Sequence, residues 1–194
     1  MLNGVVDYGA DGDWSVRIND GALELSNSEA EHALRYYTVP TVSYPGSGSV
    51  SDTDGAIVEV EVRVEAHGRA GAGIVAGFDR SKKDYLLFAT GAGQQVYVVR
   101  RTHGKARMLT ATTNDAVKEG EMNRLRVSRT DGGLALDING ARVMMVSSSD
   151  VPGRGIGIGA FGTGTFSFDE VLIQGAFKKI PAHPTRVPTE LPNQ

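Results

Sequence analysis

The sequence contains no cysteine among its 194 residues. Disulfide bonds, thiolate metal sites and cysteine nucleophiles are therefore excluded together. A chain without cysteine fits a reducing compartment. The first residues, Met-Leu-Asn-Gly-Val-Val-Asp, also show neither the basic segment nor the apolar core of a signal peptide. We therefore expect a cytoplasmic protein, or a secreted one if a leader has been removed.

Net charge and long apolar runs are also scarce. The 20 basic and 23 acidic side chains leave a formal net charge of −3, too balanced for the basic surface of a nucleic-acid-binding protein. Apolar runs stay far below the ~20 residues of a membrane-spanning helix. We expect neither a nucleic-acid partner nor a membrane span. The 40% hydrophobic and 22% charged residues are typical of a folded globular domain.

What the chain does have is glycine, at 25 residues, and a regular alternation of apolar and polar side chains. In residues 57–66, valines at every second position alternate with Glu59, Glu61, Arg63 and Glu65. A similar period of two recurs in residues 71–78, 84–90, 95–101, 123–129, 134–139, 142–146 and 166–174. Asp-Gly, Asn-Gly and Pro-Gly turn signals separate these runs. Short strands at this spacing predict an all-β, antiparallel sandwich or barrel.

We assign residues 1–177 to this β-sandwich domain and residues 178–194 to a flexible tail. The tail contains four of the seven prolines, Pro181, Pro184, Pro188 and Pro192, and little apolar material. They are three, four and four residues apart, so only Pro181 and Pro184 have the P-x-x-P spacing and it does not repeat, which favours a spacer over a polyproline ligand for a partner.

Two segments leave the local structure open. Ser28 and Glu31 have the spacing of a capping box, which favours a helix, but residues 32–39 also alternate as a strand does. We favour the strand because the neighbouring segments are strands. In residues 166–174 the apolar positions change parity after Phe168, and a bulge near Asp169 and Glu170 would bring both sets to one core.

An ordered set of fragments resembles a known superfamily. They are residues 13–16, 20–23, 72–75 with Asp79, 84–88, 123–127, 137–140, 155–157 and 168–171. In this order, over residues 1–177, the chain resembles the concanavalin A-like lectin/glucanase (laminin-G-like) superfamily. The resemblance implies a jelly-roll β-sandwich of two curved antiparallel sheets, with a concave face that often binds glycans. Because the superfamily mixes hydrolases, lectins and structural modules, the resemblance does not imply catalysis.

The acidic strand of residues 57–66 does not match a glucanase. Laminarinase-like members of the superfamily carry Glu-x-Asp-x-Glu on one strand, whereas here Glu59, Glu61 and Arg63 occupy those positions. A charged, solvated face explains them better, with cross-strand pairing to Arg124 or Arg126. Trp14, the one tryptophan, is expected at the edge of the core.

Two further patterns carry little weight. Residues 157–162 match G-x-G-x-x-G, but a dinucleotide site needs a following helix and here a strand follows. The four histidines are isolated from one another, so we expect no catalytic residue or zinc site from them. Calcium is a better candidate metal because acids are plentiful, and a structural calcium at Asp169 is the site we consider.

The concave face gives the most specific site prediction. If Ile74, Ala76 and Phe78 face the core, alternation directs other side chains of residues 71–101 outward. The polar and aromatic ones form the predicted ligand-binding array: Asp79, Tyr85, Tyr97 and Arg101. Aromatic faces and charged groups together suit a sugar.

We therefore predict a non-catalytic recognition module that binds a carbohydrate or a similar polar ligand on the concave sheet face, without a cofactor. Two alternatives stay open. One is a glycoside hydrolase or polysaccharide lyase with a non-standard acid pair, and the other is a structural or protein-interaction domain with a protein ligand.

Overall fold

The computed structural model describes residues 9–29, 34–43 and 57–174. These residues form fourteen strands and one short 3-10 turn. In chain order the elements are β1 (Gly9–Asp11), β2 (Trp14–Asn19), β3 (Ala22–Asn27), β4 (Leu34–Ser43), β5 (Ile57–Ala66), β6 (Gly71–Asp79), β7 (Asp84–Gly91), β8 (Gln95–Thr102), β9 (Lys105–Thr113), β10 (Asn123–Thr130), β11 (Gly133–Ile138), β12 (Ala141–Ser147), η1 (Ser148–Asp150), β13 (Gly155–Phe161) and β14 (Gly164–Gln174). Every alternating segment predicted from the sequence overlaps one of these strands.

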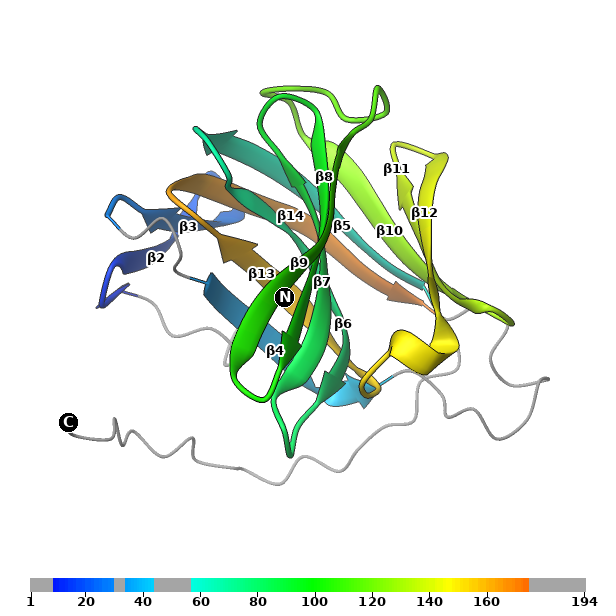
Figure 1. Cartoon of the computed structure of the whole chain (residues 1–194). Helices are drawn as coiled ribbons and strands as arrows, with labels where there is room; N and C mark the ends of the chain where they lie inside the picture. Colours follow the sequence, from blue (N-terminus) through cyan, green and yellow to red (C-terminus); the bar gives the residue numbers. More distant parts are fainter. Residues whose placement is uncertain (1–8, 30–33, 44–56, 175–194) are drawn as a thin grey trace.

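The strands form two antiparallel sheets that face each other (Figure 1). The larger sheet has the order β1-β2-β3-β14-β5-β10-β11-β12, and the smaller has the order β4-β13-β6-β7-β8-β9. The prediction of an all-β, two-sheet antiparallel sandwich of the jelly-roll type is confirmed. Among the described residues, no helix is long and apolar enough to cross a lipid bilayer. The proline-rich residues 178–194 lie outside the described part of the chain.

One apolar core fills the space between the sheets. The valines of β5 face it, and the strand register sets Val60 opposite Leu125 and Val62 opposite Phe168. Trp14, which was expected at the edge of the core, is 5% exposed and packs on Phe166 with ring centroids 5.9 Å apart. Each fully buried valine, leucine or phenylalanine side chain stabilises the folded state by about 1.5–3 kcal/mol relative to an exposed one.

The other face of β5 carries the charged residues. Arg124 Nη2 lies 2.8 Å from Glu61 Oε1, and Arg126 Nε lies 3.5 Å from Glu59 Oε1. The predicted cross-strand pairing is therefore confirmed. Both acids are held in ion pairs on the outer face of the larger sheet, as a charged strand face requires.

The two ambiguous segments are strands. β4 begins at Leu34, so the part of residues 32–39 that the structure describes is extended. In β14 the register shifts between Asp169 and Leu172, and Glu170 has φ of 44°. The predicted bulge is confirmed, and it turns Val171 and Ile173 toward the core beside Phe168.

The alternating segments did not include β1, β2, β3, β9 or β13, and alternation misplaced one core residue. β9 is an edge strand with mostly exposed side chains, so it lacks a buried stripe. Phe78 was expected in the core with Ile74 and Ala76, and that expectation is wrong. Gly77 has φ of +66° and the β6–β7 register shifts after Ala76, so Phe78 lies on the opposite face of the sheet.

Candidate functional site

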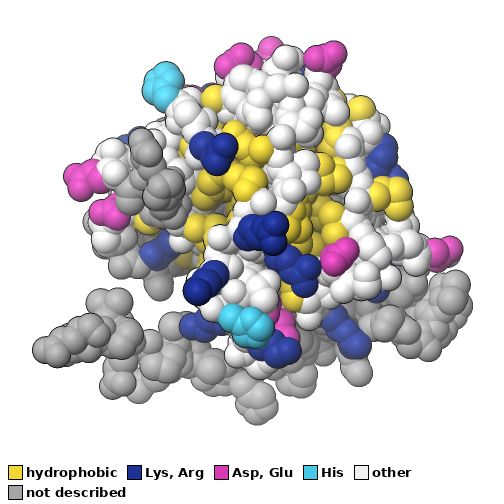
Figure 2. All heavy atoms as spheres, in the orientation of Figure 1, with side chains coloured by type: hydrophobic (Ala, Val, Ile, Leu, Met, Phe, Trp, Pro, Cys, Tyr) yellow, Lys and Arg dark blue, Asp and Glu magenta, His cyan; other side chains and the backbone are white. Residues whose placement is uncertain are grey.

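The outer face of the smaller sheet is concave. Leu34 on β4 and Met108 on β9 line the same cavity of about 430 Å³, although these strands are the two edges of the sheet and four strands lie between them. The edges can share a cavity only if the sheet curls toward its outer side. Figure 2 shows hydrophobic side chains gathered along the middle of the face turned to the viewer, with lysine and arginine beside them.

Because the sheet is curved, apolar side chains on its outer face contact one another and form a second apolar cluster. Its buried members are Val75, Phe78, Tyr85, Leu87, Ala89, Tyr97, Val99 and Phe161. Small residues on β6 and β7 allow the large rings to lie over them. A Cβ added to Gly71 would be 3.0 Å from the Tyr97 ring and 3.2 Å from the Phe161 ring, and one added to Gly91 would be 2.6 Å from Tyr97. The glycines therefore form a floor that aromatic side chains from both sides cover.

Tyr85 belongs to this cluster and is fully buried. Its ring centroid is 4.8 Å from that of Tyr36 and 6.0 Å from that of Phe78. Its hydroxyl meets no hydrogen-bond partner within the part of the chain that the structure describes. Burial, together with the neighbouring Tyr36, raises the pKa of the Tyr85 phenol. Burial also raises the pKa of Tyr97, and the positive charge of the nearby Arg69 offsets part of this increase.

The four residues of the predicted ligand-binding array do not form one open surface, although Tyr85 and Arg101 are cross-strand neighbours. Tyr85 and Tyr97 share the apolar cluster, where they are 0% and 3% exposed, so neither ring presents an open face. Asp79 Oδ1 accepts hydrogen bonds from Ser81 and Lys82 in the β6–β7 turn, and these bonds lower the pKa of the Asp79 carboxyl. Arg101 Nη1 donates to the Lys83 carbonyl oxygen at 2.6 Å. Their role in ligand binding stays a prediction.

The open part of the concave face is the cavity of about 430 Å³, which we call the apolar groove. Its apolar lining consists of Leu34, Val99, Ala106, Met108 and Phe161. Polar side chains stand at one side, from His67, Arg69 and Thr163. Of the described residues that line the groove, none is acidic. The acid pair that hydrolysis of a glycoside requires is therefore absent from this lining.

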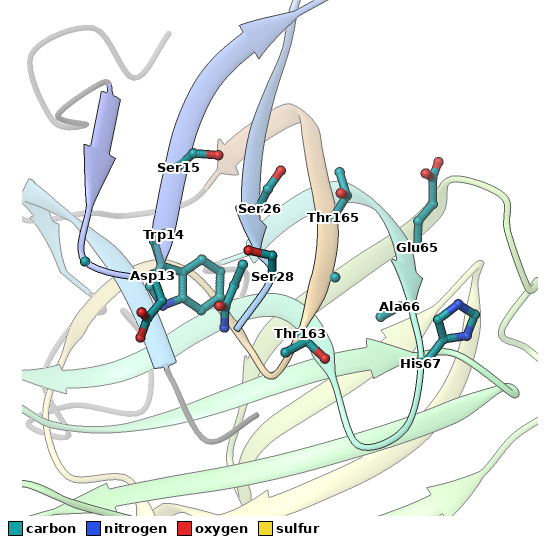
Figure 3. Close-up of a pocket in the computed structure, with 13 residues that line it drawn as sticks. Asp13, Trp14, Ser15, Ser26, Ser28, Glu65, Ala66, His67, Thr163 and Thr165 are labelled. Atoms are coloured by element: carbon teal, nitrogen blue, oxygen red, sulfur yellow. The ribbon is translucent and has the colours of Figure 1, made fainter. Parts of the chain in front are cut away.

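A second cavity, of about 460 Å³, begins on the other side of His67 and Thr163, which line both (Figure 3). We call it the hydroxyl trough. Ser15, Ser26 and Thr165 lie side by side across β2, β3 and β14, because Ser26 is in register with both of the others. The same row ends at Glu65 on β5, the partner of Thr165.

Side chains from the loops complete the trough. In Figure 3, Asp13 stands at one side and Glu65 and His67 at the other, with Ser26, Thr163 and the remaining hydroxyls between them. The trough thus offers a row of hydroxyl groups with one carboxylate at each side. Serine and threonine hydroxyls both donate and accept hydrogen bonds, and carboxylates accept them.

A buried hydrogen bond fixes the turn that separates the two cavities. Asn27 is 2% exposed, and its Nδ2 donates to the Gly162 carbonyl oxygen at 2.8 Å. Gly162 precedes Thr163 in the β13–β14 turn and has φ of +82°, a conformation that suits glycine. Asn27 therefore holds the turn that presents Thr163 to both cavities.

Sequence reasoning did not find these cavities. Alternation directs Ser15, Ser26 and Thr165 outward, but each is an ordinary polar residue in its own strand. The row exists only because β2, β3 and β14 pair in a particular register. The Asp20-Gly21 turn joins β2 to β3, but β14 is far from both in the chain, and no sequence signal gives its register. His67 was recognised only as an isolated histidine.

The calcium prediction concerns the bulge in β14. Asp169 Oδ1 accepts a hydrogen bond from the Glu170 amide at 2.8 Å, which stabilises the bulge. Within residues 9–29, 34–43 and 57–174, no three His, Cys, Asp or Glu side chains are grouped as a metal site. Calcium at Asp169 stays a prediction, which melting temperatures in calcium and in EDTA would test.

Known proteins resemble this chain in structure but not in sequence. No family model and no curated protein matches the sequence, whereas several solved structures resemble this one in fold. A protein of unknown function with a galectin-like fold from Bacillus subtilis gives a TM-score of 0.58 at 12% identity, covering 87% of this chain and 89% of that chain. A prokaryotic β-1,3-1,4-glucanase (lichenase) derived from a mouse hindgut metagenome gives 0.57 at 13% identity, covering 89% and 92%. The chain has the concanavalin A-like jelly-roll fold.

A larger enzyme contains a similar jelly roll. The xylan β-1,4-xylosidase from Bacillus halodurans C-125 matches with a TM-score of 0.54 at 12% identity, covering 82% of this chain and 34% of that chain. At these identities the likeness concerns the fold alone, so the predicted superfamily resemblance is confirmed at the level of architecture.

Proposed function

We propose that this jelly roll is a non-catalytic carbohydrate-recognition domain. Its ligand would lie in the apolar groove of the concave face and continue across His67 and Thr163 into the hydroxyl trough. The observation that carries the proposal is that a mostly apolar cavity and a hydroxyl-lined cavity adjoin at two shared residues.

This pairing suits the chemistry of a sugar chain. A pyranose ring has apolar C–H faces and a rim of hydroxyl groups, so it needs both kinds of surface. In the groove, Phe161 and Met108 supply apolar contact. In the trough, Ser26 and Thr165 exchange hydrogen bonds with sugar hydroxyls, and the Glu65 carboxylate accepts the stronger, charge-assisted ones.

The ligand is a neutral oligosaccharide rather than an acidic one. The charged groups that line the trough are Asp13 and Glu65, with His67 beside them. Two carboxylates would repel a uronate or sulfate group placed between them. Two adjoining cavities also favour several linked sugars over a single one, because each further sugar unit adds contacts within one molecule.

The similar structures supply the first ligands to try. Their names include a β-1,3-1,4-glucanase and a xylan β-1,4-xylosidase. We would therefore measure binding of mixed-linkage β-glucan, xylan and their oligosaccharides by isothermal titration calorimetry, followed by a broad glycan array.

Two variants make the test specific. Thr163→Val changes the residue shared by both cavities, and Ser26→Ala changes the middle of the hydroxyl row. Each removes one hydrogen-bonding group, so each should weaken binding about threefold to tenfold. Thr112→Val, on exposed edge strand β9, is the matched control. No binding across the array, or unchanged affinity in both variants, would contradict the proposal.

A further inference from the structure

At one end of the sandwich, Arg129 of β10 occupies a position on the core-facing side of the strand, where an apolar residue is expected. Leu125 and Val127 face the core and are fully buried. The next position on that face is Arg129, which is half-buried and stands opposite Leu134 of β11. A half-buried guanidinium loses hydration, so it destabilises the fold unless an anion or hydrogen-bond acceptors compensate it.

β8 repeats this pattern from the other sheet. Val96 and Val98 face the core, and the next position in the stripe is Arg100. Arg100 Nη1 lies 3.4 Å from Asp150 Oδ1 at the end of the 3-10 turn η1. Arg100 therefore has its own carboxylate, and Asp150 is already engaged.

Arg129 opens into a separate cavity of about 330 Å³ beside η1. Arg154 also lines it, as do Ser148 and Ser149 and the short segment from Val151 to Gly153. The charged side chains of this lining are both arginines. Within the described residues, neither Arg129 nor Arg154 has an ion-pair or hydrogen-bond partner. Two guanidinium groups with no partner among the described residues, together with two serines, thus line one hollow, and the Ser149 hydroxyl also exchanges a hydrogen bond with Ser147 Oγ at 3.0 Å.

We propose that this cavity, which we call the arginine cavity, binds an oxyanion: a carboxylate, sulfate or phosphate group. Arginine presents a planar fork of N–H donors that matches two oxygens of such a group. The serine hydroxyls can donate to a third oxygen. A volume of about 330 Å³ is about eleven times the ~30 Å³ share of a water molecule, so the cavity admits an anion attached to a larger molecule.

The arginine cavity is separate from the proposed sugar site. The arginine cavity shares no lining residue with the apolar groove or the hydroxyl trough, and its charge is opposite to that of the trough. One chain can therefore hold a neutral sugar at one site and an anion at the other.

Calorimetric titrations of the full chain would test the proposal. Sodium phosphate and sodium sulfate represent free anions, while glucuronate and a sulfated monosaccharide represent acidic groups carried by sugars. Sodium chloride at matched ionic strength is the reference. Tighter binding of the inorganic ions would identify a free anion as the ligand, and tighter binding of the sugar acids would identify an acidic glycan.

Arg129→Gln and Arg154→Gln should each weaken oxyanion binding at least about tenfold, because each removes a charge-assisted hydrogen-bond donor. Arg154 is exposed, so its variant should fold even if the Arg129 variant does not. Lys118→Gln removes the same charge from the loop between β9 and β10 and should leave binding unchanged. The proposal is overturned if no anion binds saturably, or if the Arg154 variant binds as tightly as the unmodified chain.

Discussion

Tyr97 on β8 and Phe161 on β13 meet edge to face with ring centroids 5.3 Å apart, although β6 and β7 lie between their strands. The contact is possible because Gly71 and Gly91 leave the intervening surface bare. It closes the floor of the concave face and fixes the position of Phe161 at the apolar groove.

Gly91→Ala should therefore destabilise the fold. The added Cβ would lie 2.4 Å from the Ala70 carbonyl oxygen and 2.6 Å from the Tyr97 ring. Such overpacking costs about 1–3 kcal/mol in the free energy of unfolding, which urea denaturation measures. Gly132→Ala is the matched control, because its nearest contact is Met145 Cε at 3.8 Å. Equal stability of the two variants would contradict the close packing.

Tyr85→Phe should leave the protein as stable or make it more stable, by up to about 1 kcal/mol. The substitution removes a buried hydroxyl that meets no partner among the described residues, and leaves the ring contacts in place. Urea denaturation at neutral pH measures the difference. A loss of more than about 1 kcal/mol would mean that the hydroxyl makes a stabilising bond.

The same residue predicts a dependence on alkaline pH. The pKa of Tyr85 is raised in the folded state above its ordinary value of about 10, because burial disfavours the phenolate. The folded state holds this proton more tightly than the unfolded state. Tyr85 therefore contributes stability that is complete below about pH 10 and is lost as the pH rises toward the folded-state pKa.

Stability of the unmodified chain should consequently fall more steeply above pH 10 than that of the Tyr85→Phe variant. Unfolding curves collected from pH 8 to pH 11 would show the difference. Parallel pH profiles for the two proteins would place the Tyr85 phenol in contact with solvent.

The ion pairs of the larger sheet should differ in how much each contributes to the free energy of unfolding. Glu24 is 4% exposed, and Arg17 Nε donates to it at 2.6 Å while Asn19 Nδ2 donates at 3.2 Å. Arg17→Ala leaves a buried carboxylate with only Asn19, so we expect a loss of about 1.5–3 kcal/mol. Arg124→Ala removes exposed pairs and should cost less than about 1 kcal/mol. Urea denaturation of both variants provides the comparison, and equal losses would contradict it.

Substitution of the two carboxylates of the hydroxyl trough should distinguish a binding domain from a hydrolase. We expect Asp13→Asn and Glu65→Gln to weaken oligosaccharide binding, because each loses a charged acceptor. Incubation of the unmodified chain with β-glucan or xylan should release no reducing sugar. Turnover that disappears in either variant would instead support the hydrolase alternative.

Much of the fold could be predicted from the sequence, because burial on one face of a strand leaves a direct trace in the residue pattern. The valines of residues 57–66 and the parity change after Phe168 each predicted a feature that the structure confirms. Prediction failed where that trace is absent or misleading. β9 has no buried stripe, and Gly77 reverses the face of Phe78 without changing the alternation.

The site was harder to predict because it depends on relations between distant strands. Alternation correctly directed Tyr85 and Tyr97 to the outer face of the sheet, but it could not show that curvature buries them there. Ser15, Ser26 and Thr165 become a row only through the pairing of β2, β3 and β14.

The Asn27–Gly162 hydrogen bond has a consequence for the energetics of recognition. A turn anchored from inside the protein already has the shape that a ligand meets, so little conformational freedom is lost when the ligand arrives. In the proposed carbohydrate site, the position of Thr163 would then be fixed before binding, and selectivity between sugars would depend on where their hydroxyls lie relative to it.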